Sequence, residues 1–298
     1  MMDSAVLNRT TATVTLLVGL VASALGQVPD VSIKLDAWPT YRAQNGSDSS
    51  FRWYDLLGHQ TLVSLAFRLE PGYRAFVSQR FQRPDNDGDG ESLDEYYVED
   101  PDYWRIGKQQ LPFGSGKILR ESVRAARVNT SLVIEALPIS IAACDSGSDG
   151  RTRGVIGRLG EKIGVSAAFG ENFGIASSAL TCVRRPEDAP GPGRGYKVAL
   201  GADCAWRLGS INMCAEWVGL RQGHTALDPD NDIAQVSATL WKSDVKLQAS
   251  WARSFVDHAD YFVFGSSAPI TKNLTLESSL RYRSSSFHDF SLTMHVSL

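Results

Sequence analysis

Residues 61–82, TLVSLAFRLEPGYRAFVSQRFQ, decide the fold because apolar and polar side chains alternate along them. The first half places an apolar side chain at every second position, at Val63, Leu65, Phe67 and Leu69. Pro71-Gly72 then turns the chain, and residues 73–82 return with the same alternation. Successive side chains of a strand point to opposite faces, so this stretch predicts a β-hairpin with one apolar and one polar face.

The same pattern recurs along the chain, and helical periodicity is almost absent from residue 31 onward. Two further hairpins are predicted at residues 196–217 and 234–251, and residues 290–298 form a terminal alternating strand. The sequence therefore predicts an all-β protein.

The connections between the predicted strands alternate in length. Tight turns at 71–72, 100–102, 160–161, 208–210 and 242–243 alternate with long polar loops at 83–94, 184–194 and 222–232. Short turns at one end and long loops at the other are typical of a bacterial transmembrane antiparallel β-barrel. We count about sixteen strands of about ten residues, and twelve or fourteen remain open because residues 94–99, 132–144 and 261–267 are weakly patterned.

The N-terminal residues 1–26 have the pattern of an export signal. Arg9 precedes an apolar run at 11–20, and small residues follow at 21–26. We predict cleavage after Gly26, which leaves residues 27–298 as the barrel, located in the cell outer membrane. A membrane anchor is the alternative interpretation of this segment.

Composition narrows the class of protein. The chain has 298 residues, 43% of them hydrophobic, and a formal net charge of -3. These values exclude a disordered, collagenous or basic nucleic-acid-binding chain, so we expect no nucleic-acid partner. The four cysteines fit no metal motif, and the sequence leaves their disulfide state open; they are Cys144, Cys182, Cys204 and Cys214.

A soluble β-sandwich that binds carbohydrate or a surface partner is the main alternative fold, because its strands also alternate. Large aromatic side chains argue against it, since they fall toward strand ends on the apolar face, where a membrane girdle would place them. They are Tyr73, Trp104, Trp206, Trp217, Trp251, Tyr282 and Phe290. A plugged barrel that serves as a receptor or enzyme is a third interpretation.

Residues 105–114, RIGKQQLPFG, together with the export signal, the hairpins and the terminal strand, resemble Gram-negative outer-membrane porins. The GKQQLPFG run is similar to one in phosphate-selective and related substrate-specific porins. One departure is Leu298, where such porins usually end on an aromatic residue. The resemblance implies a water-filled pore for passive diffusion of small hydrophilic solutes, contact with outer-membrane lipid, and a homotrimer. Phosphate, organic anions, sugars and uronate polymers all remain open as solutes.

The polar faces of the strands would line the lumen and set its ion preference. Our assignment places basic side chains inside at Lys34, Arg68, Arg74, Arg80, Arg105, Arg158, Lys197, Arg207, Lys246, Arg281 and Arg283. Fewer acidic side chains oppose them, at Asp36, Glu70, Glu135, Asp203, Glu216 and Glu277. The excess predicts a mild anion preference, and pairing of these side chains along the wall is the alternative.

Residues 111–127 follow a predicted strand but do not alternate, and they carry basic side chains with one opposing glutamate. In the porins that the chain resembles, a loop after an early strand folds into the barrel and narrows the pore. We therefore expect an anion-selective constriction formed by Arg105, Lys117, Arg120, Arg124 and Arg127. A solvated basic outer loop is the alternative.

Residues 85–91, DNDGDGE, place carboxylates at alternate positions before a glycine, as in the first half of a calcium loop. Asp85, Asp87 and Asp89 are the candidate ligands, and a solvated acidic loop is the alternative. We expect no required cofactor.

Enzymatic motifs are weakly represented. We find no Gly-x-Ser-x-Gly elbow, no histidine pair at metal spacing and no phosphate-binding glycine loop. Residues 257–260, DHAD, are interpreted as a hydrated outer loop, so we expect no catalytic residues and no enzymatic activity.

Overall fold

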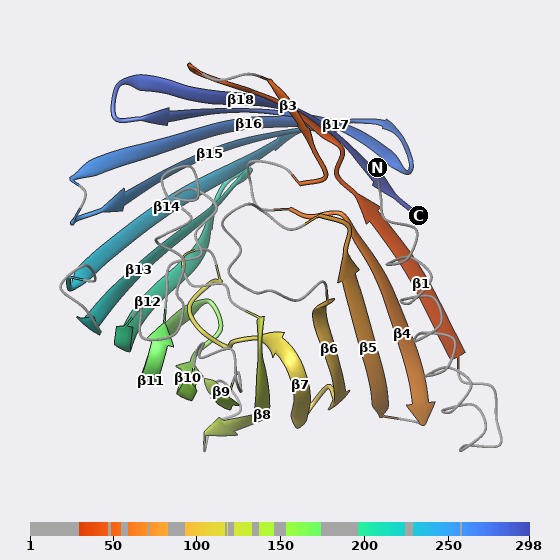
Figure 1. The fold of residues 1–298 in the computed structure, drawn as a ribbon, viewed down its shortest axis with the longest axis vertical. Helices are drawn as coiled ribbons and strands as arrows, with labels where there is room; N and C mark the ends of the chain where they lie inside the picture. Colours follow the sequence, from red (N-terminus) through yellow and green to blue (C-terminus); the bar gives the residue numbers. More distant parts are fainter. Residues whose placement is uncertain are drawn as a thin grey trace.

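The computed structural model describes residues 30–46, 49–54, 59–70, 72–82, 93–116, 118, 122–132, 137–145, 153–173, 196–223, 229–256 and 258–298. Strands form the described elements and are paired in one antiparallel sheet (Figure 1). Among these residues, no helix has the length and apolar character needed to cross a membrane. The predicted export signal lies outside the described residues, so its cleavage site stays a prediction.

The strand bounds follow the alternating stretches of the sequence. They are β1 Asp30–Ala37, β2 Thr40–Gln44, β3 Ser50–Arg52, β4 Leu62–Glu70, β5 Tyr73–Arg80, β6 Leu93–Asp100, β7 Trp104–Gln110, β8 Ser122–Leu132, β9 Leu137–Asp145, β10 Arg153–Leu159, β11 Ile163–Phe173, β12 Tyr196–Leu208, β13 Ile211–Gly223, β14 Asn231–Lys242, β15 Val245–Ser254, β16 Ala259–Thr271, β17 Leu274–Arg283 and β18 Ser286–Ser297. The weakly patterned stretches thus belong to β6, β9 and β16.

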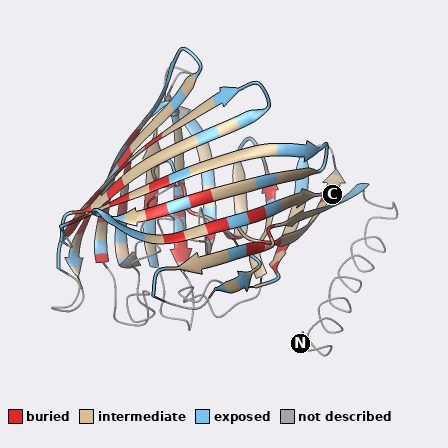
Figure 2. Cartoon of the chain, turned by 90° about the horizontal axis from the view of Figure 1, so that it is seen from above, coloured by how far each residue is buried: buried red, intermediate tan, exposed pale blue. Residues whose placement is uncertain are grey.

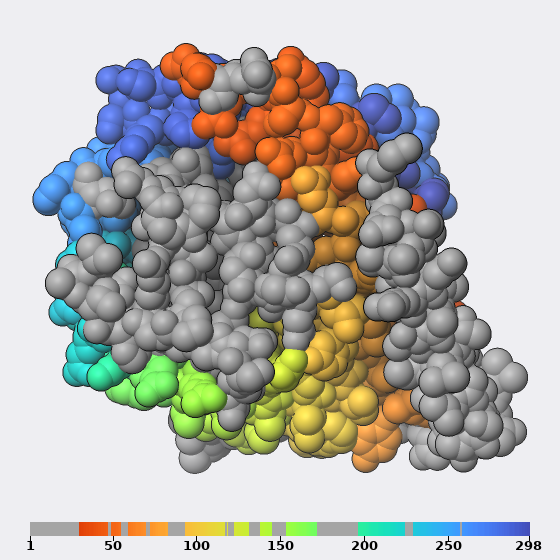
Figure 3. Space-filling model, viewed as in Figure 1, coloured from red at the N-terminus to blue at the C-terminus, as the bar shows by residue number. Residues whose placement is uncertain are grey.

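The sheet closes on itself as a barrel of 16 strands, which confirms the predicted count. Each strand from β4 to β18 pairs with the next, and the C-terminal β18 returns to the N-terminal β1 and β2. In the space-filling view the orange N-terminal strands adjoin the blue C-terminal strands along this seam (Figure 3). A single closed sheet rules out the two-sheet sandwich.

Two barrel strands are each built from two segments, which is why the strand segments outnumber the barrel strands. β1 and β2 are interrupted at Pro39, which has no N–H to donate to a ladder, although its carbonyl still accepts from Met294 N at 3.0 Å. β3 and β4 form the neighbouring barrel strand. It is interrupted between Arg52 and Leu62, where Tyr54 and Gln60 form an isolated antiparallel bridge.

The connections differ between the two ends of the barrel, as predicted. At the turn end, residues 71–72, 101–103, 133–136, 160–162, 209–210, 243–244 and 272–273 join neighbouring strands. At the opposite end, called the loop end here, most connections are longer and include 81–92, 111–121, 146–152, 174–195 and 224–230. The polarity expected of a barrel with short turns and long loops is therefore present.

Buried residues alternate with more exposed residues along many of the strands (Figure 2), and the exposed residues include many large apolar side chains on the outer face. Ile33, Val165 and Phe264 are 70%, 53% and 48% exposed, respectively, on the outside. The predicted aromatic side chains are on this face, and Tyr73 and Trp104 contact each other beside the turns, with ring centroids 6.0 Å apart. This arrangement suits an apolar surrounding outside the barrel.

Charged side chains on the outer face gather near the loop end. Asp232 accepts from Arg221 at 2.8 Å, and Asp260 accepts from Trp251 Nε1 at 2.9 Å while pairing with Arg253. These charged groups lie between the exposed apolar side chains and the loop end, so they mark the edge of the apolar belt on that side.

We expect Phe264→Arg, in the outer face of β16, to destabilise the folded barrel in lipid by about 2–4 kcal/mol, because a charge would enter the apolar belt. Ser267→Arg is the matched control, since Ser267 lies on the inner face of the same strand. Urea unfolding in lipid vesicles measures both. Equal losses for the two variants would show that the assigned faces are wrong.

Candidate functional site

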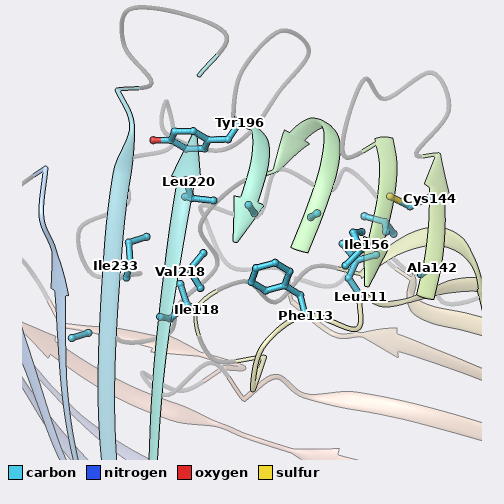
Figure 4. Packing of buried hydrophobic residues seen from close by; sticks show 14 of the residues in the cluster. Leu111, Phe113, Ile118, Ala142, Cys144, Ile156, Tyr196, Val218, Leu220 and Ile233 are labelled. Atoms are coloured by element: carbon cyan, nitrogen blue, oxygen red, sulfur yellow. The ribbon is translucent and has the colours of Figure 1, made fainter. Parts of the chain in front are cut away.

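The chain between β7 and β8 folds into the barrel. This inward segment, residues 111–116 and 118, lies against the inner face of β10–β13, across the barrel from β1 and β2 (Figure 4). It therefore reduces the open section of the lumen, as the sequence predicts for residues that follow an early strand.

Apolar contacts hold the inward segment to the wall. Phe113 is 2% exposed, and its ring approaches Gly201 so closely that a Cβ there would lie 2.8 Å from a ring carbon. Ile118 is also buried, in one cluster with the inward-facing Ile156 and Val218 (Figure 4). Lumen walls of porin-like barrels are usually polar, so this apolar ledge is a local seat for the segment rather than a water-lined surface.

Polar contacts fix the backbone of the same segment. Gly114 N donates to Ser166 Oγ at 2.9 Å, and the Arg158 guanidinium donates to the Gly114 carbonyl while it pairs with Asp203. The Ser115 hydroxyl donates to Glu216 at 2.5 Å. Arg158 thus fastens the segment to the wall, which is a different task from the free lumenal charge that the sequence predicts.

Residues 111–127 are not one loop, because β8 begins at Ser122. Within β8 the buried Val123 and Ala125 face inward, so the intervening Arg124 faces outward, where its Nε donates to the Tyr96 hydroxyl at 3.0 Å. The prediction that Arg124 lines a constriction is therefore wrong. The period of two that sets strand orientation continues through this segment, although its apolar signal is weak.

Arg127, three residues later in β8, faces the lumen, as predicted. It donates to Asn129 Oδ1 at 2.8 Å and to Ser140 Oγ at 3.4 Å, and no carboxylate among the described residues pairs with it. Its charge is thus uncompensated by its hydrogen-bond partners. Lys117 and Arg120 lie outside the described residues, and their roles stay predictions.

Most of the other lumenal arginines pair with carboxylates, and two carboxylates are each shared by two arginines. Asp289 of β18 is fully buried and accepts from Arg281 Nε at 2.7 Å and from Arg42 Nε at 3.0 Å. His288 also lies 3.3 Å from this carboxylate. Two guanidiniums around one carboxylate leave a net positive charge on the inner wall of β2, β17 and β18.

A second cluster has the same design near the turn end. Glu99 is 2% exposed, and it accepts from Arg74 and from Arg105 Nε, the latter at 2.6 Å. Arg80 pairs with Asp94 at 2.6 Å. Arg74, Arg80 and Arg105 are therefore paired along the wall, and positive charge remains where two of them, Arg74 and Arg105, share the single carboxylate of Glu99.

The remaining predicted lumen residues are on the inner face but near its rims. Arg68, Lys197 and Arg207 are exposed at strand ends, by the register of β4 and β12. The candidate calcium ligands Asp85, Asp87 and Asp89 lie outside the described residues.

The described cysteines are free: Cys144 and Cys214 face inward, and the wall separates both from Cys204, which faces outward. Cys182 lies outside the described residues.

Sequence reasoning missed several inward-facing residues, including the shared carboxylates Glu99 and Asp289 and the side chains of Arg42, Phe76 and Tyr97. Arg42 was missed because β2 is short and follows the break at Pro39, so its alternation covers only five residues. Phe76 and Tyr97 were missed because aromatic side chains on a predicted lumen face contradict the apolar-out rule. The sequence could have placed these two aromatic residues only by their spacing, since Phe76 is two residues from Arg74 and Tyr97 is two residues from Glu99 on the same strand.

No protein-family model and no curated protein matches this chain. Solved structures of outer-membrane proteins do match the chain in fold. The outer membrane channel DcaP of Acinetobacter baumannii aligns with a TM-score of 0.61 at 11% identity, over 91% of this chain and 97% of that one. The anion-selective porin from Comamonas acidovorans aligns at 0.56 and 10% identity, over 90% and 99%. OmpT of Vibrio cholerae, in a trimer form, aligns at 0.60 and 8% identity, over 91% and 99%. The chain therefore has the fold of these outer-membrane proteins.

We expect Phe113→Ala to loosen the inward segment, because it leaves a cavity against Gly201 and costs about 3–5 kcal/mol. Single-channel conductance in a planar bilayer should rise. Phe169→Ala makes the same change on the outer face, where Phe169 is 58% exposed, and should leave the conductance as it is. An unchanged conductance in Phe113→Ala would show that the segment does not limit the pore.

Asp289→Ala should destabilise the barrel by about 3–5 kcal/mol, because it leaves Arg42 and Arg281 without their shared carboxylate. Urea unfolding in lipid vesicles measures the loss. Asp244→Ala, at the exposed turn between β14 and β15, is the control. A loss as small as that of the control would mean that the buried cluster adds no stability.

Proposed function

We propose that this chain, which has the 16-strand barrel fold of outer-membrane porins, forms a water-filled pore for passive diffusion of small hydrophilic solutes, with a mild anion preference. It acts in the cell outer membrane, with its apolar outer face in contact with lipid. In this proposal the protein acts as a channel and not as an enzyme.

The observation that carries this proposal is the reversal of polarity across the wall. The outer face bears exposed apolar side chains, whereas ionised pairs such as Arg281–Asp289 and Arg158–Asp203 face inward. Burying charges inside a barrel is favourable only where partners or water solvate them, so a lumen with these residues supports an aqueous path. The apolar outside is stable only in lipid or against another apolar surface.

The anion preference rests on the composition of the charged clusters. Arg42 and Arg281 share Asp289, Arg74 and Arg105 share Glu99, and Arg127 is bonded to neutral groups. Each cluster leaves positive charge on the lumen wall, and a low-dielectric wall focuses its field on the pore axis. One similar structure is described as an anion-selective porin, which agrees with this proposal.

Assembly as a homotrimer is part of the proposal, because a similar structure is described as a trimer form. We further propose that Asp85, Asp87 and Asp89, in the sequence between β5 and β6, bind calcium independently of the pore.

The test is the reversal potential of the refolded protein in a planar bilayer under a salt gradient. We expect an anion-selective potential, and Arg127→Glu should shift it toward cations by reversing an unpaired lumenal charge. Arg124→Glu is the matched control, since Arg124 lies on the outer face of the same strand. Cation selectivity in the unaltered protein would overturn the anion preference, and absence of conductance would overturn the pore.

A further inference from the structure

A row of inward-facing residues crosses the inner wall from β1 to β7. Register places side by side, in this order, Ser32, Ala66, Phe76, Tyr97 and Gly107. The neighbouring row toward the turn end contains Arg68, Arg74, Glu99 and Arg105 in the same strand order. An aromatic row and a guanidinium row therefore lie next to each other on the lumen side.

The aromatic row is stacked. Phe76 and Tyr97 have ring centroids 5.1 Å apart and planes inclined by 25°, and Arg105 Cζ lies 4.0 Å from the Tyr97 centroid. Gly107 makes this possible, because a Cβ there would lie 2.2 Å from the Tyr96 carbonyl and no side chain competes for the space beside Tyr97. Tyr97 is thus held between Phe76 and Arg105.

Phe76 differs from Tyr97 because its other neighbour in the row is small. Ala66 on β4 and then Ser32 on β1 follow it, and neither side chain is large enough to cover an aromatic ring. Phe76 is half-buried, so part of its ring remains accessible to solvent. Neighbouring strands are about 4.8 Å apart, so a planar group placed over Ala66 would meet Phe76 at stacking distance.

Arg68 supplies a cation at this position. It is the next inward-facing residue after Ala66, about 6.8 Å along β4, and it is exposed. Among the described residues it forms no ion pair, not even with Asp30, which lies opposite it in register. Arg74, its neighbour across β5, already pairs with Glu99. A free guanidinium therefore stands beside a partly open aromatic ring.

We propose that this surface, formed by Ala66, Arg68 and Phe76, binds aromatic carboxylates as they pass through the pore. The ring of the solute stacks on Phe76 above Ala66, and its carboxylate accepts hydrogen bonds from Arg68. Guanidinium pairs with a planar carboxylate through two donors, which sets the orientation of the solute. This inference rests on the proposed pore and names a solute class for it.

A ring that is not aromatic lacks the stacking contact, so the site discriminates by ring chemistry at equal charge. Benzoate and cyclohexanecarboxylate carry the same charge and nearly the same size. An aromatic stacking contact corresponds to roughly a two- to tenfold difference in affinity. The surface therefore predicts preference for benzoate by that factor.

The experiment measures interruption of single-channel current by each carboxylate, added at pH 7.5 to the refolded protein in a planar bilayer. Benzoate should reach half-maximal block at a concentration roughly two- to tenfold below that of cyclohexanecarboxylate. Phe76→Leu and, separately, Ala66→Leu, which fills the space above β4, should each make the two solutes equal. Arg68→Gln should weaken block by both. Phe169→Leu, on the outer face, should change neither.

The outcomes separate this inference from the function on which it rests. An open channel that benzoate and cyclohexanecarboxylate block equally would overturn the aromatic site and leave the pore intact. A protein that inserts without conductance would overturn the pore itself. If Phe76→Leu fails to fold, Ala66→Leu decides, because retained benzoate preference in that variant would contradict the site.

Discussion

Closure of the hydrogen-bonded ring is the constraint on which the rest of the structure depends. A strand edge in an apolar surrounding leaves N–H and C=O groups without partners, and each such group is costly. The pairing of β18 with β1 and β2 removes that edge, even though Pro39 cannot donate and the first strand is split around it. The two faces of the wall then become an inside and an outside, and the alternation of the sequence becomes a difference in environment.

The inner face also stabilises arginines that lie close together on the wall. Asp289 and Glu99 are buried, and each is shared by two guanidiniums, so neither carboxylate is left unpaired. Removing either carboxylate would leave like charges close together, whereas the pairs hold neighbouring strands at a fixed distance. Stability of the wall and its positive charge therefore come from the same side chains, so the proposed anion preference would be a consequence of how this wall is held together.

The inward segment shows why an apolar patch exists inside a polar lumen. Phe113 and Ile118 need an apolar seat, and β10–β13 provide it with small or aliphatic inward side chains such as Gly201 and Val218. Arg158 adds orientation, since one guanidinium joins the wall carboxylate Asp203 to the Gly114 carbonyl. On the opposite wall the inner surface carries the arginine clusters beside the Phe76–Tyr97 pair. The pore that we propose would lie between this fastened segment and the arginine-bearing wall.

Alternation in the sequence by itself determined the class of fold and the orientation of most side chains, because a period of two is a local property of an extended chain, whereas the structure settled the strand count at sixteen among the twelve, fourteen or sixteen left open. It placed Arg158 and Arg281 inside correctly. It could not determine which charges pair, since Arg42 and Asp289 are 247 residues apart and meet only when the ring closes. It also missed the inward aromatic pair Phe76 and Tyr97 and misplaced Arg124, because side-chain polarity does not reveal register where the strand begins inside an apparent loop. Partners across the barrel are a property of the closed wall, and only the tertiary structure supplies them.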